Sequence, residues 1–268
     1  MPKLGVINSD GKKAMVLTPP ENISLDLVDL RLRAFAATPY DQLLVELNSV
    51  DAAERALASQ ADALLIDTFG DYAIQRIRAA SPVPVVGAGE SGIAEASSMG
   101  LRPFSIVTVW PESMKWLYSE VLSRSSGGHL CQDVHHVSPE SELSFLGTDL
   151  GVKARMIRGE EDLLDEIVKA CHKAIETDES EAILLGCTCM SPIAGKIQEQ
   201  CSFPVIDASA AGLRAAYRLL AEQPPRSETV TTKRAGTVSR IVQTLLEAEF
   251  EKSYEPDECE VCSIVTNS

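Results

Sequence analysis

Short, uniformly apolar runs alternate along most of this chain with longer stretches of helical periodicity. An apolar run without polar alternation is typical of a parallel strand that is covered on both faces. Parallel strands need crossover connections, which are usually helices, so the alternation predicts an α/β fold. The expected strands are residues 4–7, 43–47, 63–66, 83–86, 104–109, 182–185 and 204–206, and helices are expected at 54–60, 72–79 and 160–175.

The chain also contains an internal repeat. Residues 63–68, Ala-Leu-Leu-Ile-Asp-Thr, align with residues 182–187, Ala-Ile-Leu-Leu-Gly-Cys, and each run ends at a small polar residue. Two further pairs keep the same order: Gly-Val-Ile-Asn at 5–8 with Ser-Ile-Val-Thr at 105–108, and Pro-Val-Val-Gly-Ala-Gly at 84–89 with Pro-Val-Ile-Asp-Ala-Ser at 204–209. Three ordered pairs predict two pseudosymmetric lobes, each a mainly parallel sheet flanked by helices.

The repeat sets the expected domain boundaries. Residues 1–98 together with 207–222 are expected to form the first lobe, and residues 99–206 the second. Residues 223–268 begin with a polar linker. The apolar spacing from Val238 to Leu246 then predicts one final amphipathic helix, followed by a flexible tail.

Composition excludes several classes of function. The net charge of −15 leaves no basic surface for nucleic acid, and it disfavours an anionic membrane as a partner. No apolar run approaches the roughly 20 residues that a spanning helix needs. Seven cysteines in a chain of 268 residues do not make a disulfide framework, so we expect reduced cysteines and a cytoplasmic location. A small molecule remains as the expected partner.

Thr68 and Cys187 stand at equivalent strand ends of the two repeats. Ligands of parallel α/β sheets bind beyond the carboxyl ends of the strands, where the following helices present free N–H groups. If the two lobes face each other, these two side chains flank one cleft. Inverting a carbon next to a carbonyl needs a proton removed from one face and returned to the other, and a cysteine near a helix N-terminus supplies a usable thiolate. Backbone N–H groups could stabilise the resulting oxyanion without a metal or cofactor.

At these residues the sequence resembles the aspartate/glutamate/hydantoin racemase superfamily, and most of all its hydantoin and allantoin racemase branch. The likeness lies in ordered motifs: Ile7-Asn8-Ser9, Thr68-Phe-Gly-Asp71, Pro84-Val-Val-Gly-Ala-Gly-Glu90, Phe104-Ser-Ile-Val-Thr108, Leu185-Gly-Cys187 and Pro204-Val-Ile-Asp207. The resemblance implies two pseudosymmetric α/β lobes with the active site in the cleft between them. It also implies an enzyme without a cofactor that commonly forms a homo-oligomer.

The resemblance also assigns roles to residues. It implies a racemase or related isomerase that exchanges the proton alpha to a carboxylate or amide of a small compound of the hydantoin, allantoin, aspartate or glutamate type. Cys187 is the acid or base on one face of that carbon, and Thr68 stands on the other. The groups expected to hold the substrate's oxygens come from Asn8, Ser9, Phe69, Gly70, Thr188 and Cys189, with Glu90 and Thr108 as further pocket candidates.

One departure from the family pattern leaves the chemistry open. The family's first-lobe cysteine is Thr68 here, and an aliphatic hydroxyl ionises far less readily than a thiol. Thr68 could relay a proton through water, which gives slow or one-directional racemisation. Cys187 alone could instead protonate an enolate formed by decarboxylation, as arylmalonate decarboxylases do. Finally, the protein could have kept the pocket as a non-catalytic small-molecule binder.

Other motifs carry rival interpretations. Residues 87–92 satisfy G-x-G-x-x-G between a strand and a helix, so NAD binding is an alternative. Cys189 is expected to pack rather than to join a metal site, because no further ligands stand nearby. The Cys259-Glu-Val-Cys262 pair has the spacing of half a zinc site but stands alone in the expected tail. His135 and His136 are expected to be solvated.

Overall fold

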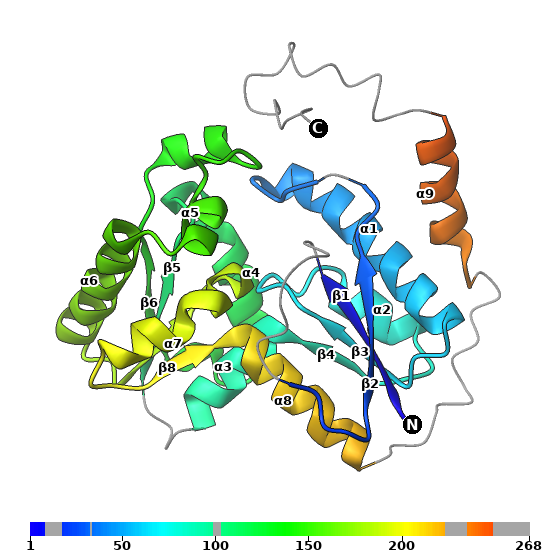
Figure 1. Cartoon of the computed structure of the whole chain (residues 1–268), viewed down its shortest axis with the longest axis horizontal. Helices are drawn as coiled ribbons and strands as arrows, with labels where there is room; N and C mark the ends of the chain where they lie inside the picture. The colour runs from blue at the N-terminus through cyan, green and yellow to red at the C-terminus, as the bar shows by residue number, and fades with distance from the viewer. Residues whose placement is uncertain (9–17, 33, 99–102, 223–234, 249–268) are drawn as a thin grey trace. The chain divides into compact units, whose positions relative to one another are not determined.

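The computed structural model describes residues 1–8, 18–32, 34–98, 103–222 and 235–248. It contains two four-stranded sheets in which every strand is parallel to its neighbours (Figure 1). The predicted α/β class with two mainly parallel sheets is therefore confirmed. The described residues group into two compact units, the first up to Ser91 and from Ser209 onward, the second Gly92–Ala208.

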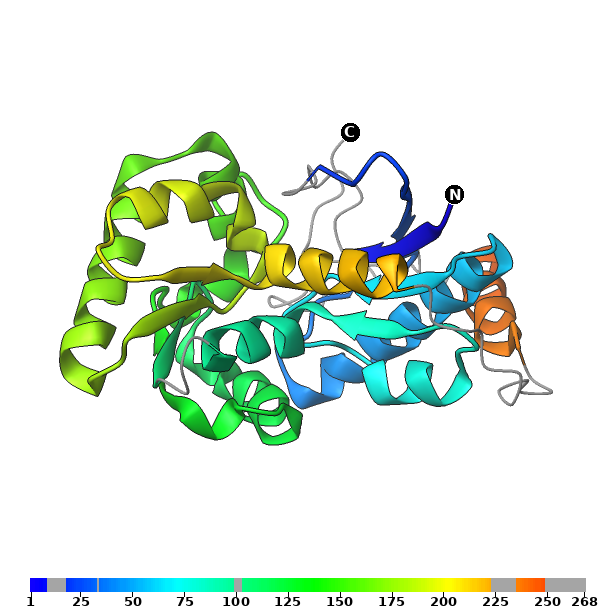
Figure 2. The same ribbon diagram turned by 90° about the horizontal axis from the view of Figure 1, so that it is seen from below.

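The first sheet lies in the first unit. Its strands are β1 (Lys3–Asn8), β2 (Ser24–Asp29), β3 (Ala63–Ile66) and β4 (Val85–Gly87), in the order β2-β1-β3-β4. The helices along this part of the chain are α1 (Pro39–Ala58), α2 (Ile74–Ala80), α3 (Ala88–Ser98), α8 (Ala208–Ala221) and α9 (Thr237–Glu247), of which α3 begins in the first unit and continues into the second. Figures 1 and 2 show helices on both faces of the sheet.

Strand β3 is apolar throughout because both of its faces are covered. Leu64 and Ile66 belong to one buried cluster, which also contains Ala56 of α1 and residues of α2. Ala63 and Leu65 belong to a second cluster, which contains residues of α8. Successive side chains of a strand point to opposite faces, so a strand between two helical layers has no position for a polar side chain.

The prediction of a strand at residues 43–47 is wrong, because these residues lie in α1. That helix begins with a capping box, in which the Thr38 hydroxyl accepts from the Asp41 N–H at 3.3 Å and the Asp41 carboxylate accepts from the Thr38 N–H at 2.9 Å. Pro39 takes the first helical position, where its missing N–H is not needed. Leu43 is 65% exposed, so the apolar run lies largely at the surface of a helix and not inside a sheet.

The second sheet lies in the second unit. Its strands are β5 (Phe104–Thr108), β6 (Cys131–His136), β7 (Ala182–Leu185) and β8 (Val205–Asp207), in the order β6-β5-β7-β8. The helices are α4 (Lys115–Arg124), α5 (Val152–Arg158), α6 (Glu161–Asp178) and α7 (Ser191–Glu199), with short 3-10 segments η1 (Glu112–Met114), η2 (Gly128–Leu130), η3 (Glu140–Phe145) and η4 (Thr188–Met190). Helix α6, which the periodicity predicts, packs on β5, β6 and β7.

The prediction that His135 and His136 are solvated is wrong, because both are half-buried in the edge strand β6. His135 Nε2 lies 2.7 Å from Asp178 Oδ2 at the end of α6, and the same oxygen accepts from Ser105 Oγ at 2.6 Å. Burial raises the pKa of Asp178, and hydrogen bonds led by the one from Ser105 more than offset it, so the net shift is downward. This polar cluster ties β6 to β5 and α6.

The predicted final helix is confirmed as α9, which packs on α1. Arg31 connects the two, since it forms an ion pair with the fully buried Asp51 of α1 and donates to Ser239 O at 3.0 Å and Gln243 Oε1 at 2.6 Å on α9. Arg55 makes a second ion pair with Asp51 at 3.1 Å. A buried carboxylate needs such partners, so α9 covers a charge network of the first unit.

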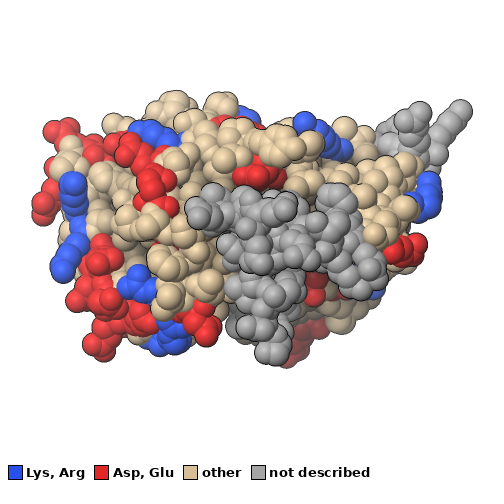
Figure 3. All heavy atoms as spheres, turned by 90° about the horizontal axis from the view of Figure 1, so that it is seen from above, with Lys and Arg blue, Asp and Glu red and all other residues tan. Residues whose placement is uncertain are grey.

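Acidic side chains are more numerous than basic ones on the surface that Figure 3 shows, as the net charge requires. Ion pairs such as Arg76 with Glu46 at 2.8 Å involve an exposed arginine and contribute little to stability. Within the described ranges, no helix combines the length and the apolar character that crossing a membrane demands.

Candidate active site

The turns that follow β3 and β7 leave their sheets in the same way. We call residues 67–73 the first turn and residues 186–191 the second turn. The Asp67 N–H donates to the Ile7 carbonyl of β1 at 2.9 Å, and the Gly186 N–H donates to the Val107 carbonyl of β5 at 2.8 Å. Each turn therefore starts one residue past its strand, against the neighbouring central strand. The sequence repeat predicts this equivalence.

Thr68 lies in the first turn, which has an unusual backbone. The Asp71 N–H donates to the Thr68 carbonyl at 3.2 Å, and both Asp71 and Ala73 adopt left-handed conformations, with φ of 46° and 59°. Such values are uncommon for residues other than glycine and are found where surrounding interactions hold the chain. Thr68 Oγ1 is buried and has no hydrogen-bond partner among the described residues.

Asp71 caps helix α3, which follows the neighbouring strand β4. Its Oδ1 accepts from the Gly89 N–H at 2.9 Å, and its Oδ2 accepts from the Glu90 N–H at 2.8 Å. A Cβ on Gly87 would lie 2.5 Å from the Asp71 carboxyl, and one on Gly89 would lie 2.0 Å from the Phe69 carbonyl oxygen. The glycines therefore make room for the first turn.

This cap corrects the interpretation of residues 87–92 as a dinucleotide-binding loop. A pyrophosphate needs the free N–H groups at the start of the helix, together with the positive end of its dipole. Those N–H groups already bind the Asp71 carboxylate, whose own negative charge occupies the position. The G-x-G-x-x-G pattern is explained by close packing instead.

The other predicted site residues of the first unit that the structure describes lie in or next to the first turn. Phe69 is 4% exposed and Gly70 is buried beside Thr68. The Glu90 carboxylate forms an ion pair with Arg78. Asn8 ends β1, next to the first turn, and Ser9 lies outside the described residues.

Cys187 is the second residue of the second turn and lies half-buried just past the end of β7. Its Sγ accepts from the Cys189 N–H at 3.1 Å, and its carbonyl accepts from the Met190 N–H at 3.0 Å. The turn passes through η4 into α7, whose first residue, Ser191, donates from Oγ to Asp207 Oδ1 at 2.5 Å. The sulfur of Cys187 thus has a backbone N–H donor, and a helix begins at the end of the turn.

Cys187 and Cys189 are joined by a disulfide, with their Cα atoms 5.1 Å apart. The predictions that the cysteines are all reduced and that Cys189 only packs are therefore wrong. The 3-10 turn brings the two side chains within bonding range, although they are separated by one residue in the sequence. Cys131, Cys171 and Cys201 are free, and burial raises the pKa of each thiol, for Cys131 and Cys171 to about 12.

A chain of hydroxyl groups holds the peptide that precedes Cys187. Tyr118 of α4 donates to the Gly186 carbonyl at 3.1 Å, and Thr108 Oγ1 lies 2.5 Å from the Tyr118 hydroxyl. Thr108 Oγ1 also accepts from the Trp110 N–H at 3.3 Å. Thr108 and Tyr118 are fully buried. Thr108, which the sequence predicts as a pocket residue, therefore makes its hydrogen bonds in the protein interior.

His136 lies at the end of β6, beside Thr108 in the register of the sheet. Its Nδ1 donates to the Trp110 carbonyl at 2.9 Å, and its ring meets Tyr118 edge to face with centroids 5.6 Å apart. Its Nε2 is buried without a hydrogen-bond partner in the described part of the chain. Burial lowers the pKa of His136, so the neutral ring is favoured.

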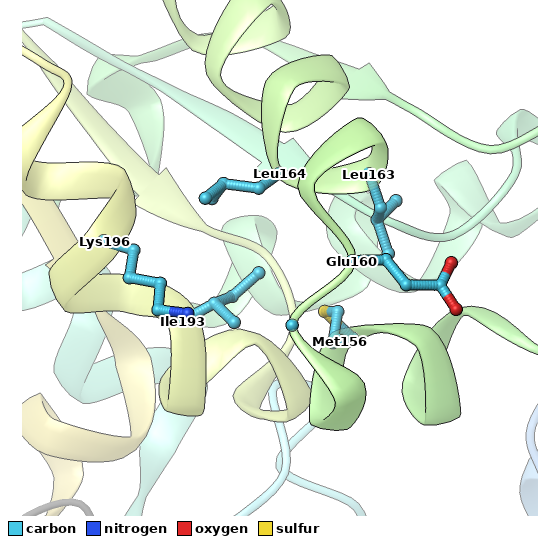
Figure 4. A pocket seen from close by; sticks show the side chains of 7 residues that line it. Met156, Glu160, Leu163, Leu164, Ile193 and Lys196 are labelled. Atoms are coloured by element: carbon cyan, nitrogen blue, oxygen red, sulfur yellow. The ribbon is translucent and has the colours of Figure 1, made fainter.

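Two cavities in the second unit do not involve the candidate residues. Figure 4 shows the smaller one, about 10 Å³, where Met156, Leu164 and Ile193 come from α5, α6 and α7. It holds no more than about one water molecule. A wider depression of about 350 Å³ is lined in part by Arg155 and Arg158, which both pair with Glu160.

The structure thus brings the predicted residues together as two separate groups, one per unit. Asp71 and Tyr118 are additional residues that hold the two turns, and neither is among the site residues expected from the sequence. Asp71 has a signal, since it closes the Thr68-Phe-Gly-Asp motif. Tyr118 has none, because its role depends on the packing of α4 against the sheet. No group of three or more acidic, cysteine or histidine side chains suited to a metal occurs among the described residues.

Comparison with known proteins gives consistent matches. A family model described as Asp/Glu/Hydantoin racemase matches residues 17–216. The hydantoin racemase of Paenarthrobacter aurescens is 30% identical over 183 residues, covering 68% of this chain and 72% of that protein. Allantoin racemase from Klebsiella pneumoniae has a TM-score of 0.68 at 19% identity, covering 88% of this chain and 98% of that chain. Arylmalonate decarboxylase has a TM-score of 0.55 at 19% identity, covering 81% and 92%. The two structural matches show a shared fold.

Proposed function

Because the chain belongs to the Asp/Glu/hydantoin racemase family, and with it to the isomerases, we propose that it exchanges the proton alpha to a carboxylate or amide of a small amino-acid derivative. The hydantoin racemase relative favours a hydantoin as the substrate, with allantoin and aspartate or glutamate as further candidates. Cys187 is the acid and base on one face of the carbon, and Thr68 serves the other. The proposed reaction uses no cofactor.

The position of Cys187 carries this proposal. The side chain lies half-buried at the carboxyl end of β7. The Cys189 N–H donates to its sulfur, and the chain continues through η4 into α7. In the reduced protein, a backbone N–H donor and a nearby helix start are features that stabilise a thiolate, and a positioned thiolate can act as a base. The bond to Cys189 must be reduced for this role, and we propose a reducing cytoplasm as the location that achieves it.

Thr68 is the weaker partner in the proposed reaction. Its buried Oγ1 has no hydrogen-bond partner among the described residues, so no neighbouring group there activates the hydroxyl. We infer that Thr68 relays its proton through water. A thiolate removes a proton far more readily than such a relay, so kcat would differ between the two directions of racemisation, while kcat/KM stays equal because the two enantiomers have the same free energy.

The substrate's oxygens would bind to groups of the two turns and of the adjoining strand end. We propose Asn8, Ser9, Phe69, Gly70 and Thr188 for this role. Cys189, Glu90 and Thr108 remain further candidates, and their polar groups contact Cys187, Arg78 and Tyr118 in turn.

Decarboxylation of an arylmalonate is the second candidate function. The observation that favours it is the asymmetry of the two turns, with a thiol-bearing residue in one and a hydroxyl in the other. Loss of carbon dioxide generates the enolate without a base, so one acid, Cys187, is enough to complete the reaction. Arylmalonate decarboxylase shares the fold.

Proton exchange in heavy water tests the proposal. The reduced protein is incubated with a 5-substituted hydantoin, with allantoin and with aspartate, and deuterium at the alpha carbon is followed by NMR against a protein-free blank. Cys187→Ala is expected to lower the rate at least about 1,000-fold, since a positioned acid–base group contributes about 10²–10⁴. Thr68→Ala is expected to lower it about 10-fold, because water partly replaces the relay.

The matched control is Cys131→Ser, which removes a cysteine on β6 outside both turns and is expected to keep the exchange rate. Exchange that persists in Cys187→Ala would contradict the assigned base. Release of carbon dioxide from an arylmalonate, without exchange on the other compounds, would favour the second candidate. Binding without turnover of any compound would identify a small-molecule binder.

A further inference from the structure

The disulfide of the second turn involves the sulfur on which the proposed function depends. Cys187 and Cys189 are both half-buried, so small thiols and disulfides can reach them from solvent. The 3-10 turn fixes their separation, since the Met190 N–H donates to the Cys187 carbonyl at 3.0 Å. The two sulfurs therefore remain neighbours when the bond between them is broken.

The surroundings of this pair favour thiol–disulfide exchange more than those of the other described cysteines. The N–H of Cys189 points at the sulfur of Cys187, and α7 begins directly after the turn. In contrast, burial raises the pKa of Cys131, Cys171 and Cys201, which disfavours their thiolate forms. Exchange requires a thiolate with access to its partner, so it is concentrated at the second turn.

We propose that Cys187 and Cys189 form a reversible oxidation site for low-molecular-weight disulfides such as oxidised glutathione. The Cys187 thiolate attacks one sulfur of the small disulfide, whose S–S bond breaks and releases one small thiolate. The Cys189 thiolate then attacks Cys187 in the mixed disulfide and releases the second. Two protein thiols are oxidised, one small disulfide is reduced to two thiols, and the two protons pass to these leaving groups.

This inference rests on the proposed function for its consequence. A sulfur in a disulfide carries no proton and has no thiolate form, so it can neither accept nor donate at the substrate carbon. Oxidation of the pair would therefore stop the reaction without any movement elsewhere in the fold. Reduction by a small thiol restores both sulfhydryl groups and, with them, the acid–base group.

Thiol labelling tests the site independently of activity. Trypsin cleavage after Lys173 and Lys196 gives one peptide, residues 174–196, that contains Cys187 and Cys189 and no other cysteine. The whole protein is equilibrated in glutathione buffers of rising oxidation, quenched with an alkylating reagent and digested. After reduction, this peptide is expected to carry two alkyl labels. After oxidation, it is expected to carry none and to have a mass about 2 Da lower than that of the unlabelled reduced peptide.

Activity and a variant complete the experiment. Alpha-proton exchange of the oxidised protein is expected to be at least about 100-fold slower than that of the reduced protein, and to recover on reduction. Cys189→Ser is expected to keep one bound glutathione on the peptide, because it lacks the resolving thiol, whereas wild type keeps none. The Cys131→Ser control is expected to match wild type in labelling and in the ratio of the two rates.

Two results would overturn the proposed site: a peptide that stays fully labelled in every buffer, or wild type that retains a glutathione adduct. An oxidised peptide with an unchanged exchange rate would overturn the effect on activity. If neither form exchanges protons on any compound, the proposed function fails, and the labelling result alone decides whether the oxidation site exists.

Discussion

The turn after β3 and the turn after β7 leave equivalent strands with the same backbone hydrogen bond, yet different side chains hold them. A carboxylate supports the first turn: Asp71, in a left-handed conformation, caps α3. Hydroxyl groups support the second turn, through Tyr118 on Gly186 and Ser191 on Asp207. The groups offered for chemistry differ as well, since Thr68 has an unpaired hydroxyl in the described structure and Cys187 a sulfur with an N–H partner.

This comparison separates what the repeat determines from what it leaves free. The repeat determines where each strand ends and therefore where each turn can place a side chain. The interactions that fix each turn come from different residues within its own unit, so each unit can change its reactive group without disturbing the other. Substitutions in each unit test this independence. Tryptophan fluorescence reports on the second unit, because Trp110 and Trp116 both lie there.

The largest effect is expected from Gly89→Ala in the first unit. The new Cβ would lie 2.0 Å from the Phe69 carbonyl oxygen, so either α3 or the first turn must move. We expect the free energy of unfolding to fall by about 3 kcal/mol. Urea unfolding followed by circular dichroism reports this loss, while the tryptophan fluorescence transition of the second unit should shift less.

Gly195→Ala is the matched control for this substitution. Gly195 lies in the exposed part of α7, and a Cβ there meets nothing within 4 Å. Alanine should therefore raise the free energy of unfolding by about 0.5–1 kcal/mol. Equal stability of Gly89→Ala and wild type would mean that α3 and the first turn are not closely coupled.

Tyr118→Phe addresses the second turn in the same manner. It removes the donor to the Gly186 carbonyl and the acceptor of the Thr108 hydroxyl hydrogen, while the Trp110 N–H still donates to Thr108 Oγ1, and we expect a loss of about 1–2 kcal/mol. Tryptophan fluorescence in urea should report the full shift. The proposed reaction should lose kcat with little change in KM, because the peptide that carries Cys187 is less well fixed.

Tyr40→Phe provides the control, since Tyr40 is 82% exposed on α1 and its hydroxyl faces solvent. It is expected to unfold like wild type. A Tyr118→Phe variant with unchanged stability and kcat would show that the hydroxyl chain does not hold the second turn.

Asp71→Asn is expected to have a smaller effect than either change. Asparagine tolerates the left-handed backbone, so the substitution removes only the charge and one acceptor from the start of α3. A loss of about 1 kcal/mol should appear in urea unfolding by circular dichroism. The exposed Asp165→Asn on α6 serves as the neutral comparison, and a loss of equal size there would point to net charge rather than to the cap.

The smallest effect concerns the acid stability of the second unit. Burial lowers the pKa of folded His136, so as the pH falls through about 6.5 the unfolded chain takes up the proton first. The contribution of the neutral ring to stability is therefore present above that pH and is lost below it. His136→Gln should reduce the drop in Tm between about pH 7.5 and about pH 5.5.

His129→Gln, which changes an exposed histidine, should leave that drop unaltered. Equal pH dependence in wild type and His136→Gln would show that the buried ring does not couple to unfolding.

The central strands of both sheets could be predicted from the sequence, because strands covered on both faces are apolar at every position. The same signal fails at residues 43–47, where leucines lie on a half-buried helix, and periodicity cannot separate these cases in so short a run. The edge strands β2 and β6 escape detection because charged and polar residues stand within them. The opposite edge strands, β4 and β8, begin with apolar residues and could be predicted, so the residues of a strand and not its edge position decide whether it is detected.

The residues of the candidate site also differ in whether the sequence predicts them. Thr68 and Cys187 were predictable, since both follow apolar strands that the repeat aligns. The disulfide was not, because cysteines one residue apart meet only when the turn between them has a particular backbone. The Tyr118 contact depends on how α4 packs, and nothing local in the sequence encodes it.

The hydroxyl chain of the second unit has a fixed polarity. The Trp110 amide gives its hydrogen to Thr108, Thr108 gives to Tyr118, and Tyr118 gives to the Gly186 carbonyl, so an amide and a carbonyl dictate the orientation of both hydroxyl hydrogens between them. Neither alcohol can turn toward an incoming molecule without breaking a contact in the protein interior. At the carboxyl edge of the second sheet, the hydroxyl oxygens of Thr108 and Tyr118 are held in hydrogen bonds of the protein interior. The sulfur of Cys187 can still exchange its bonding partner.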